Sequence, residues 1–179
     1  MHGPASSGWL LVALCAATGA YCLLRMRSAV EEQRRTAGGE ALMGFGMAAM
    51  AVPAAVLAPP RWAWVACTAV FGAAALHALW AARTGPHHLH HLVGASAMVY
   101  MAAVMASGAH AGVPVLTGVL LVYFTGYVLW TGTRLVPVAV AGHGGGGSHR
   151  TTGWGDRVEV SRACRLSMGI GMLAMLLTL

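Results

Sequence analysis

Methionine recurs with the same spacing in three stretches of the chain. Residues 43–50 read MGFGMAAM and residues 168–175 read MGIGMLAM, so six of eight positions are identical without a gap. Residues 94–101 read GASAMVYM and keep small residues at both glycine positions and methionine at the last two methionine positions. Spacings of four and three residues place side chains along one stripe of a helix. The stripe residues are Met43, Met47, Met50, Met98, Met101, Met105, Met168, Met172 and Met175.

Thioether sulfur has a specific metal preference. It is soft and uncharged, so it favours Cu(I) over Zn(II), Mg(II) or Ca(II), and Ag(I) should bind equally well. A ring of thioethers can replace the hydration shell of a monovalent cation without burying an opposing charge, and successive layers suit passage of an ion. The stripes therefore predict a protein that binds, transports or delivers Cu(I).

A side chain able to bind a metal precedes each stripe. Glu40 lies three residues before Met43, His91 seven before Met98, and Cys164 four before Met168. The histidines ahead of the middle stripe form a cluster composed of His87, His88, His90 and His91. Histidine is a common metal ligand, so we expect these residues to collect the metal, although a solvated polar cap is an equal alternative for the cluster.

Two other interpretations of these residues stay open. Methionine also fills irregular gaps between helices, so the stripes are also compatible with an accessory subunit of a larger membrane complex. His77 lies within an apolar stretch, where an ionisable residue is a functional candidate. Paired with His88 or His91, it would hold a haem between neighbouring helices.

The composition indicates the elements that must position these side chains. With 58% hydrophobic residues, 9% charged residues and a mean hydropathy of +0.67, the chain is not a soluble globular domain. A membrane-spanning helix needs about 20 apolar residues. We expect an all-α polytopic membrane protein with a single domain over 1–179 and six transmembrane helices arranged as three hairpins, with a glycine-rich cytoplasmic loop at 134–162. The expected helices are 8–24, 41–58, 62–82, 91–110, 113–133 and 164–179.

The arginines predict the orientation of these helices. Ten of the eleven basic residues, all arginine, fall on one side of the expected spans, and only Arg61 falls on the other. The positive-inside rule places the ten in the cytoplasm and both termini outside. The arginines lie between apolar runs, so no nucleic-acid partner is expected. The bias toward glycine, alanine and arginine is typical of GC-rich coding, which indicates a bacterial plasma membrane.

The sequence resembles two groups of membrane proteins. Its multi-pass layout, the acid Glu40 before a Met-rich second helix, His91 with Met98 and Met101 on the fourth helix, and the Met-rich end resemble an actinobacterial family known as domain of unknown function 5134. That resemblance covers nearly the whole chain and implies location and topology without an activity. A looser similarity is to trimeric eukaryotic copper transporters, whose MxxxM helix is matched by Met43 with Met47 and by Met168 with Met172, whereas Gly94 replaces the corresponding methionine.

We therefore expect Cu(I) as the bound ion, with haem as an alternative. The expected partners are the lipid bilayer and a membrane cuproenzyme or larger membrane complex. The chain carries no catalytic triad, phosphate-binding loop or HExxH motif, so an enzyme is not the expected class.

Overall fold

The computed structural model describes residues 4–27, 31–53, 56, 58–82, 88–108, 112–141 and 158–179. Within these ranges every regular element is a helix, so the expected all-α class is confirmed. The helices are α1 (Pro4–Arg25), α2 (Glu31–Met50), α3 (Arg61–Ala82), α4 (His88–Ser107), α5 (Pro114–Ala141) and α6 (Val158–Leu176).

Four of these helices are long and apolar enough to cross a membrane. The candidate spans are Gly8–Arg25, Arg61–Ala81, Leu89–Ser107 and Pro114–Arg134. Helices α2 and α6 differ because each begins with charged residues: α2 starts EEQRR and α6 starts VEVSR. The chain is therefore a membrane protein with four apolar candidate spans in its described residues.

The expected bounds of three helices were wrong. The second helix was expected at 41–58 but begins at Glu31 and ends at Met50, because Pro53 cannot continue a helix and also restricts the residue before it. Helix α6 begins at Val158, six residues before the expected start, and α5 continues to Ala141. The expected loop 134–162 therefore includes the end of α5 and the start of α6, and its central residues 142–157 lie outside the described part of the chain.

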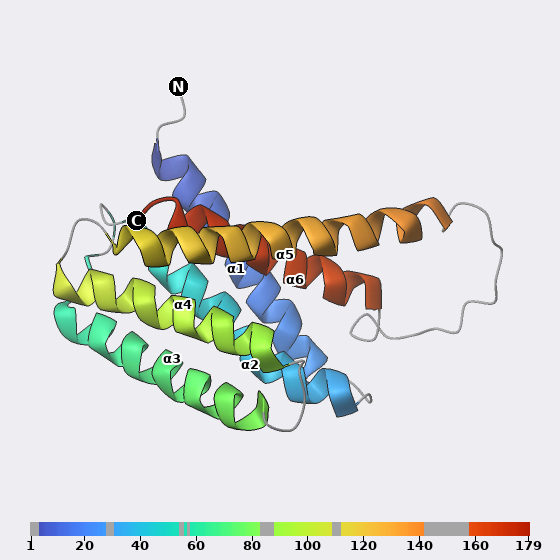
Figure 1. Ribbon diagram of the computed structural model, residues 1–179, viewed down its shortest axis with the longest axis horizontal. Coiled ribbons are helices and arrows are strands. Elements are labelled where there is room, and N and C mark those ends of the chain that lie inside the picture. Colours follow the sequence, from blue (N-terminus) through green and yellow to red (C-terminus); the bar gives the residue numbers. More distant parts are fainter. Residues whose placement is uncertain are drawn as a thin grey trace.

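The helices associate most extensively with their neighbours in sequence: α1 with α2, α3 with α4, and α5 with α6. Helix α2 also contacts α4 and α6 and so connects the pairs. In Figure 1, α2, α4 and α6 all begin toward the right of the view and run toward the left, whereas α3 and α5 run the opposite way. The three methionine-bearing helices therefore point in the same direction.

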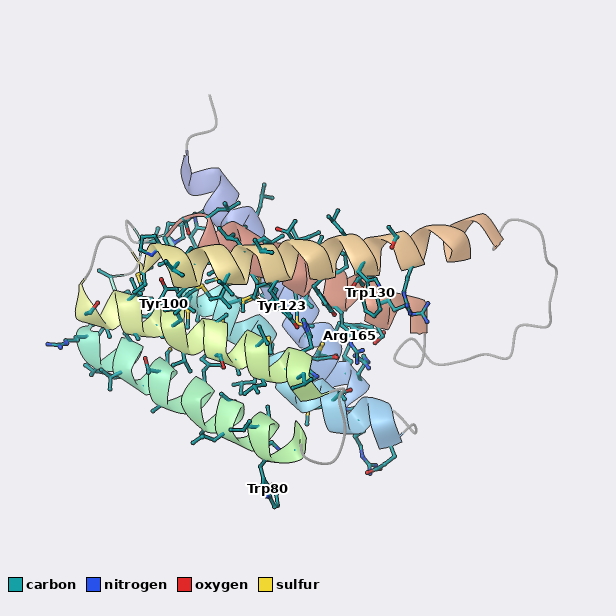
Figure 2. All side chains as sticks on the ribbon, in the orientation of Figure 1. Trp80, Tyr100, Tyr123, Trp130 and Arg165 are labelled. Carbon is teal, nitrogen blue, oxygen red and sulfur yellow. The ribbon has the colours of Figure 1, made fainter. Side chains whose placement is uncertain are left out.

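Large apolar side chains cover the outside of the bundle. Trp62 on α3 is 72% exposed and Trp80 on the same helix is 68% exposed. Figure 2 shows Trp80 projecting away from the helices. Such exposure is typical of helices that face lipid, where amphipathic tryptophan rings anchor at the membrane interface.

Glycine allows α1 and α2 to approach each other closely. A Cβ atom on Gly44 would lie 2.9 Å from both the Cα and the backbone nitrogen of Gly19. Backbone atoms cannot move aside as the end of a side chain can, so this crossing requires glycine. Elsewhere, Gly108 has a φ of 69°, the left-handed conformation that commonly terminates a helix, and it directly follows α4.

This crossing makes a prediction about stability. We expect Gly44→Ala to lower the thermal unfolding midpoint of the purified protein in detergent, because the added methyl group forces α1 and α2 apart. The matched control is Gly39→Ala on the same helix, where a Cβ atom would meet nothing within 4 Å. Equal midpoints for the two variants would show that the crossing is not as close as described.

Candidate functional site

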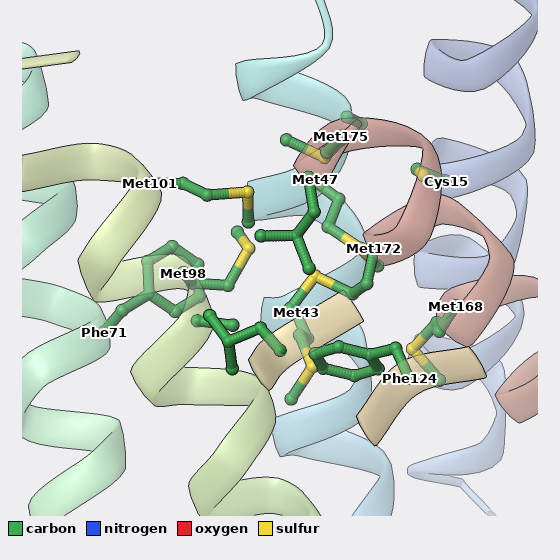
Figure 3. Close-up of a cluster of buried hydrophobic side chains, with 14 of the residues drawn as sticks. Cys15, Met43, Met47, Phe71, Met98, Met101, Phe124, Met168, Met172 and Met175 are labelled. Carbon is green, nitrogen blue, oxygen red and sulfur yellow. The ribbon is translucent and has the colours of Figure 1, made fainter. Parts of the chain in front are cut away.

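Seven of the nine stripe methionines are buried together. Met47 and Met98 are 0% exposed and Met172 is 1% exposed. The other buried stripe residues are Met43, Met101, Met168 and Met175. Figure 3 shows side chains from α2, α4 and α6 converging on one space between the helices, together with Phe71 and Phe124. We call these seven methionines the methionine core.

Glycines of the repeat leave room for side chains of other helices. A Cβ atom on Gly46 of α2 would meet the ring of Phe71 and would lie 3.1 Å from Cε of Met98. One on Gly171 of α6 would lie 3.3 Å from Sγ of Cys15 and 3.7 Å from Sδ of Met47. The second glycine of each full repeat therefore faces a core methionine from another helix. Small residues at these positions bring the three helices within reach of one another's thioethers.

In α4, Gly94 stands where the two full repeats have their first methionine, and Met43 of α2 packs against it. A Cβ atom on Gly94 would lie 2.9 Å from Sδ of Met43 and 3.0 Å from its Cε. The side chain of Met43 thus reaches across from α2 and lies against the position where α4 would carry its own methionine. Met43 and Met168, the first methionines of the two full repeats, are both buried.

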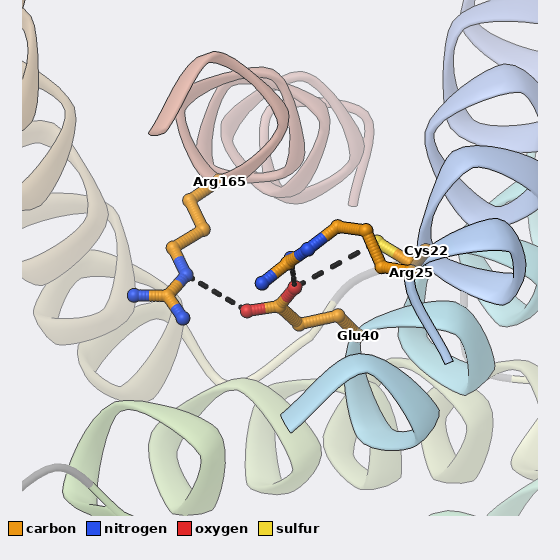
Figure 4. Close-up of polar contacts among 4 residues, drawn as sticks. All are labelled: Cys22, Arg25, Glu40 and Arg165. Carbon is orange, nitrogen blue, oxygen red and sulfur yellow. Dashed lines mark hydrogen bonds and ion pairs between the residues drawn. The ribbon is translucent and has the colours of Figure 1, made fainter. Parts of the chain in front are cut away.

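Glu40 lies within α2 at the arginine-rich end of the core, and both of its carboxylate oxygens are engaged by arginine. Arg25 Nη1 donates to Oε2 at 2.5 Å and Arg165 Nε donates to Oε1 at 2.7 Å (Figure 4). Cys22 Sγ lies 3.7 Å from the same Oε2. We call Arg25, Glu40 and Arg165 the ion-pair triad; its members come from α1, α2 and α6.

The charges of the triad are buried to different extents. The side chains of Arg25 and Glu40 are 1% and 2% exposed, whereas that of Arg165 is 41% exposed. Arg25 Nε is buried without a hydrogen-bond partner in the described residues. Two guanidinium groups face one carboxylate, so the triad carries a net positive charge. Glu40 thus precedes Met43 by three residues in α2, and both of its carboxylate oxygens bind arginine.

The histidine cluster belongs mostly to a helix. The expected helix began only at residue 91, but His88, His90 and His91 all lie in the first turn of α4; His87 falls outside the described residues. The ring of His90 stacks on Tyr127 with centroids 3.9 Å apart, and its Nδ1 lies 3.2 Å from the hydroxyl of Tyr123. His90 thus packs against α5. The two tyrosines lie four residues apart on one helical face, a signal that could have indicated this contact from the sequence.

Two cavities adjoin the methionine core, and each includes core residues in its lining. The first, of about 590 Å³, lies where α2, α4 and α6 end and is lined by Met50, Met101, Met105 and Met175. The second, of about 530 Å³, lies among α2, α3 and α4 and contains His77, His91 and Met43 in its wall. We call them the methionine cavity and the histidine cavity.

The remaining predicted ligands are dispersed. Cys164 is half-buried in α6, next to Arg165, and none of the four cysteines forms a disulfide. Across the described ranges, no three side chains of histidine, cysteine, aspartate or glutamate lie close enough to hold a metal ion. Sulfur from methionine is thus the ligand type that the described fold concentrates.

These features define an all-α membrane protein with a buried core of thioethers. Residues 32–179 match the family described as Domain of unknown function (DUF5134), and the chain belongs to that family. The resemblance based on Glu40, the middle stripe and the Met-rich end is thereby confirmed. No curated protein and no solved structure matches the chain.

Proposed function

We propose that this protein binds Cu(I) between thioethers of α2, α4 and α6 and transports it or delivers it to a membrane cuproenzyme. The observation that carries the proposal is the burial of Met47, Met98 and Met172, one from each helix, at 0%, 0% and 1% exposure in a single core.

The chemistry of the core supports a soft monovalent ion. A cation taken from water into an apolar interior needs ligands that replace its hydration shell. Thioether sulfur does so for Cu(I) and Ag(I), whereas Mg(II) and Ca(II) require oxygen ligands. Because thioethers are neutral, a bound monovalent ion would leave one positive charge in the core. A divalent ion would leave two, and burying the larger charge costs more.

The membrane layout that we propose has all six helices crossing the bilayer and both termini outside. The arginines support it: Arg25 at the end of α1, Arg134 near the end of α5 and Arg165 near the start of α6 belong to the same end of the bundle, and Arg61 begins α3 at the other end (Figure 1). The positive-inside rule makes the first of these ends cytoplasmic. We place the protein in a bacterial plasma membrane.

The test is metal analysis of the purified full-length protein. The protein is loaded with Cu(I) anaerobically, freed of loose ion with a competing Cu(I) chelator, and measured for retained copper by elemental analysis. We expect retained copper and, in a parallel loading, retained silver, with no retention of zinc. A protein that retains neither copper nor silver would contradict the proposal and leave methionine as a packing residue in an accessory subunit.

A second candidate function, haem binding, is favoured by the histidine cavity. His77 and His91 line the same cavity of about 530 Å³, and apolar residues such as Phe71 form much of its wall. Two imidazoles in the wall of one apolar cavity are a ligand set suited to haem iron.

The absorption spectrum separates the two candidates. If the protein binds haem through His77, the protein as isolated shows a Soret band that His77→Ala removes. On the Cu(I) proposal we expect no Soret band and the same copper content in His77→Ala as in the parent. A Soret band that depends on His77 would promote the haem function.

A further inference from the structure

The methionine cavity has an unusual lining. Its four methionines come from three helices: Met50 from α2, Met101 and Met105 from α4, and Met175 from α6. Most of its other lining residues are apolar, including leucines of α1. The hydroxyl of Thr178 is in the lining but donates to the carbonyl oxygen of Met175 at 2.7 Å. Thioether sulfur is therefore the main group that this cavity offers to a ligand.

The cavity is continuous with the methionine core. Met101 and Met175 line the cavity and are also core residues, at 2% and 8% exposure. Met105 also lines the cavity but is 46% exposed. Thioether groups thus follow one another in space from the surface of the protein to its buried centre. A soft ion can exchange one sulfur ligand for the next along such a series without passing through an unliganded state, as multi-site conduction requires.

The other end of the core is unfavourable for a cation. Arg25 and Arg165 both point their guanidinium groups at Glu40, and this leaves a net positive charge close to the core (Figure 4). Repulsion between like charges is strong where the surroundings are apolar. The histidine cavity also reaches the core, but Met43 is the one methionine in its wall.

We infer that the methionine cavity is the site at which Cu(I) enters and leaves the core, and that the ion-pair triad closes the opposite end. This inference rests on the proposed function and selects one of its two forms: the protein takes up and releases Cu(I) through the same opening, so it delivers the ion to a membrane cuproenzyme and does not transport it across the membrane. In the proposed orientation this opening faces away from the cytoplasm. The molecule that gives up or receives Cu(I) at this opening is itself a Cu(I) complex with exchangeable soft ligands.

The test measures how fast bound copper leaves. The protein carrying Met50→Leu and Met105→Leu is loaded with Cu(I), mixed rapidly with a chromophoric Cu(I) chelator, and compared with the parent. We expect transfer per bound copper to be slower by about tenfold or more, the scale of effect of residues around a metal site. The retained copper of both proteins is measured alongside. The matched control is Met26→Leu, which removes a 44% exposed methionine outside the stripes.

Each outcome decides one of the two claims. If the parent retains no copper, the proposed function fails. If the parent retains copper but the double variant transfers it as fast as the control does, the exchange site is wrong and the function stands. Slowed transfer in Gly39→Leu, which adds a side chain to the wall of the histidine cavity, with normal transfer in the double variant would assign the exchange to that cavity. If the double variant does not fold, Met105→Leu alone is measured, because its side chain is largely outside the packed core.

Discussion

Replacing Met47, Met98 and Met172 together by leucine is expected to abolish retention of Cu(I) while leaving the fold nearly intact. Leucine matches methionine in size and apolarity, and such exchanges usually cost less than about 1.5 kcal/mol each in a packed core. The substitution removes three sulfur atoms that are almost completely buried. The measurements are retained copper after chelator competition and the thermal unfolding midpoint in detergent.

The control for the triple variant is Met26→Leu, which removes a thioether just after α1. We expect this control to retain as much copper as the parent. A host that depends on the protein should change its copper or silver tolerance with the triple variant and not with the control. If the triple variant folds and retains copper like the parent, the central methionines are packing residues and the Cu(I) proposal is wrong.

The largest expected effect on stability comes from Glu40→Leu. It leaves Arg25 buried at 1% exposure without its only described ion-pair partner. Removing one partner of a buried ion pair typically destabilises a protein by about 3–5 kcal/mol, because the remaining charge is uncompensated. Arg165 should be affected less, because its side chain is 41% exposed and can reorient toward water. The measurement is the free energy of unfolding in mixed detergent.

A second variant distinguishes the ion pair from a general packing effect. We expect Arg25→Met in the Glu40→Leu background to restore most of the stability, because replacing a buried ion pair by apolar residues of similar volume is often neutral. If the double variant is as unstable as the single one, the triad does not hold α1, α2 and α6 together in the way that we describe.

The methionine repeat is the part of the sequence that best predicts which side chains form the core. Residues three and four apart share a helical face, so the spacing alone predicts that Met43, Met47 and Met50 lie on one side of their helix. The apolar runs also locate the four candidate membrane spans within a few residues. The apolar run 41–58 does not predict the bounds of α2. It includes Pro53, which cannot continue the helix, and it leaves out the charged residues with which the helix begins.

The partners of the candidate ligands could not be predicted. Glu40 and Arg165 are separated by 125 positions, and nothing in the local pattern of either one indicates the other. Only the general rule that an acid near the membrane finds a cationic partner points to an ion pair. The stacking of His90 on Tyr127 and the two cavities depend on how side chains of different helices pack, which helix periodicity does not determine.

X-ray absorption spectroscopy of the copper-loaded, chelator-washed protein tests the central claim most directly, because it identifies the atoms bound to the metal. Our account predicts Cu(I) coordinated by sulfur alone, and it predicts that this signal is lost from the variant with leucine at positions 47, 98 and 172. Copper coordinated only by nitrogen or oxygen, or a sulfur shell that persists in that variant, would contradict it.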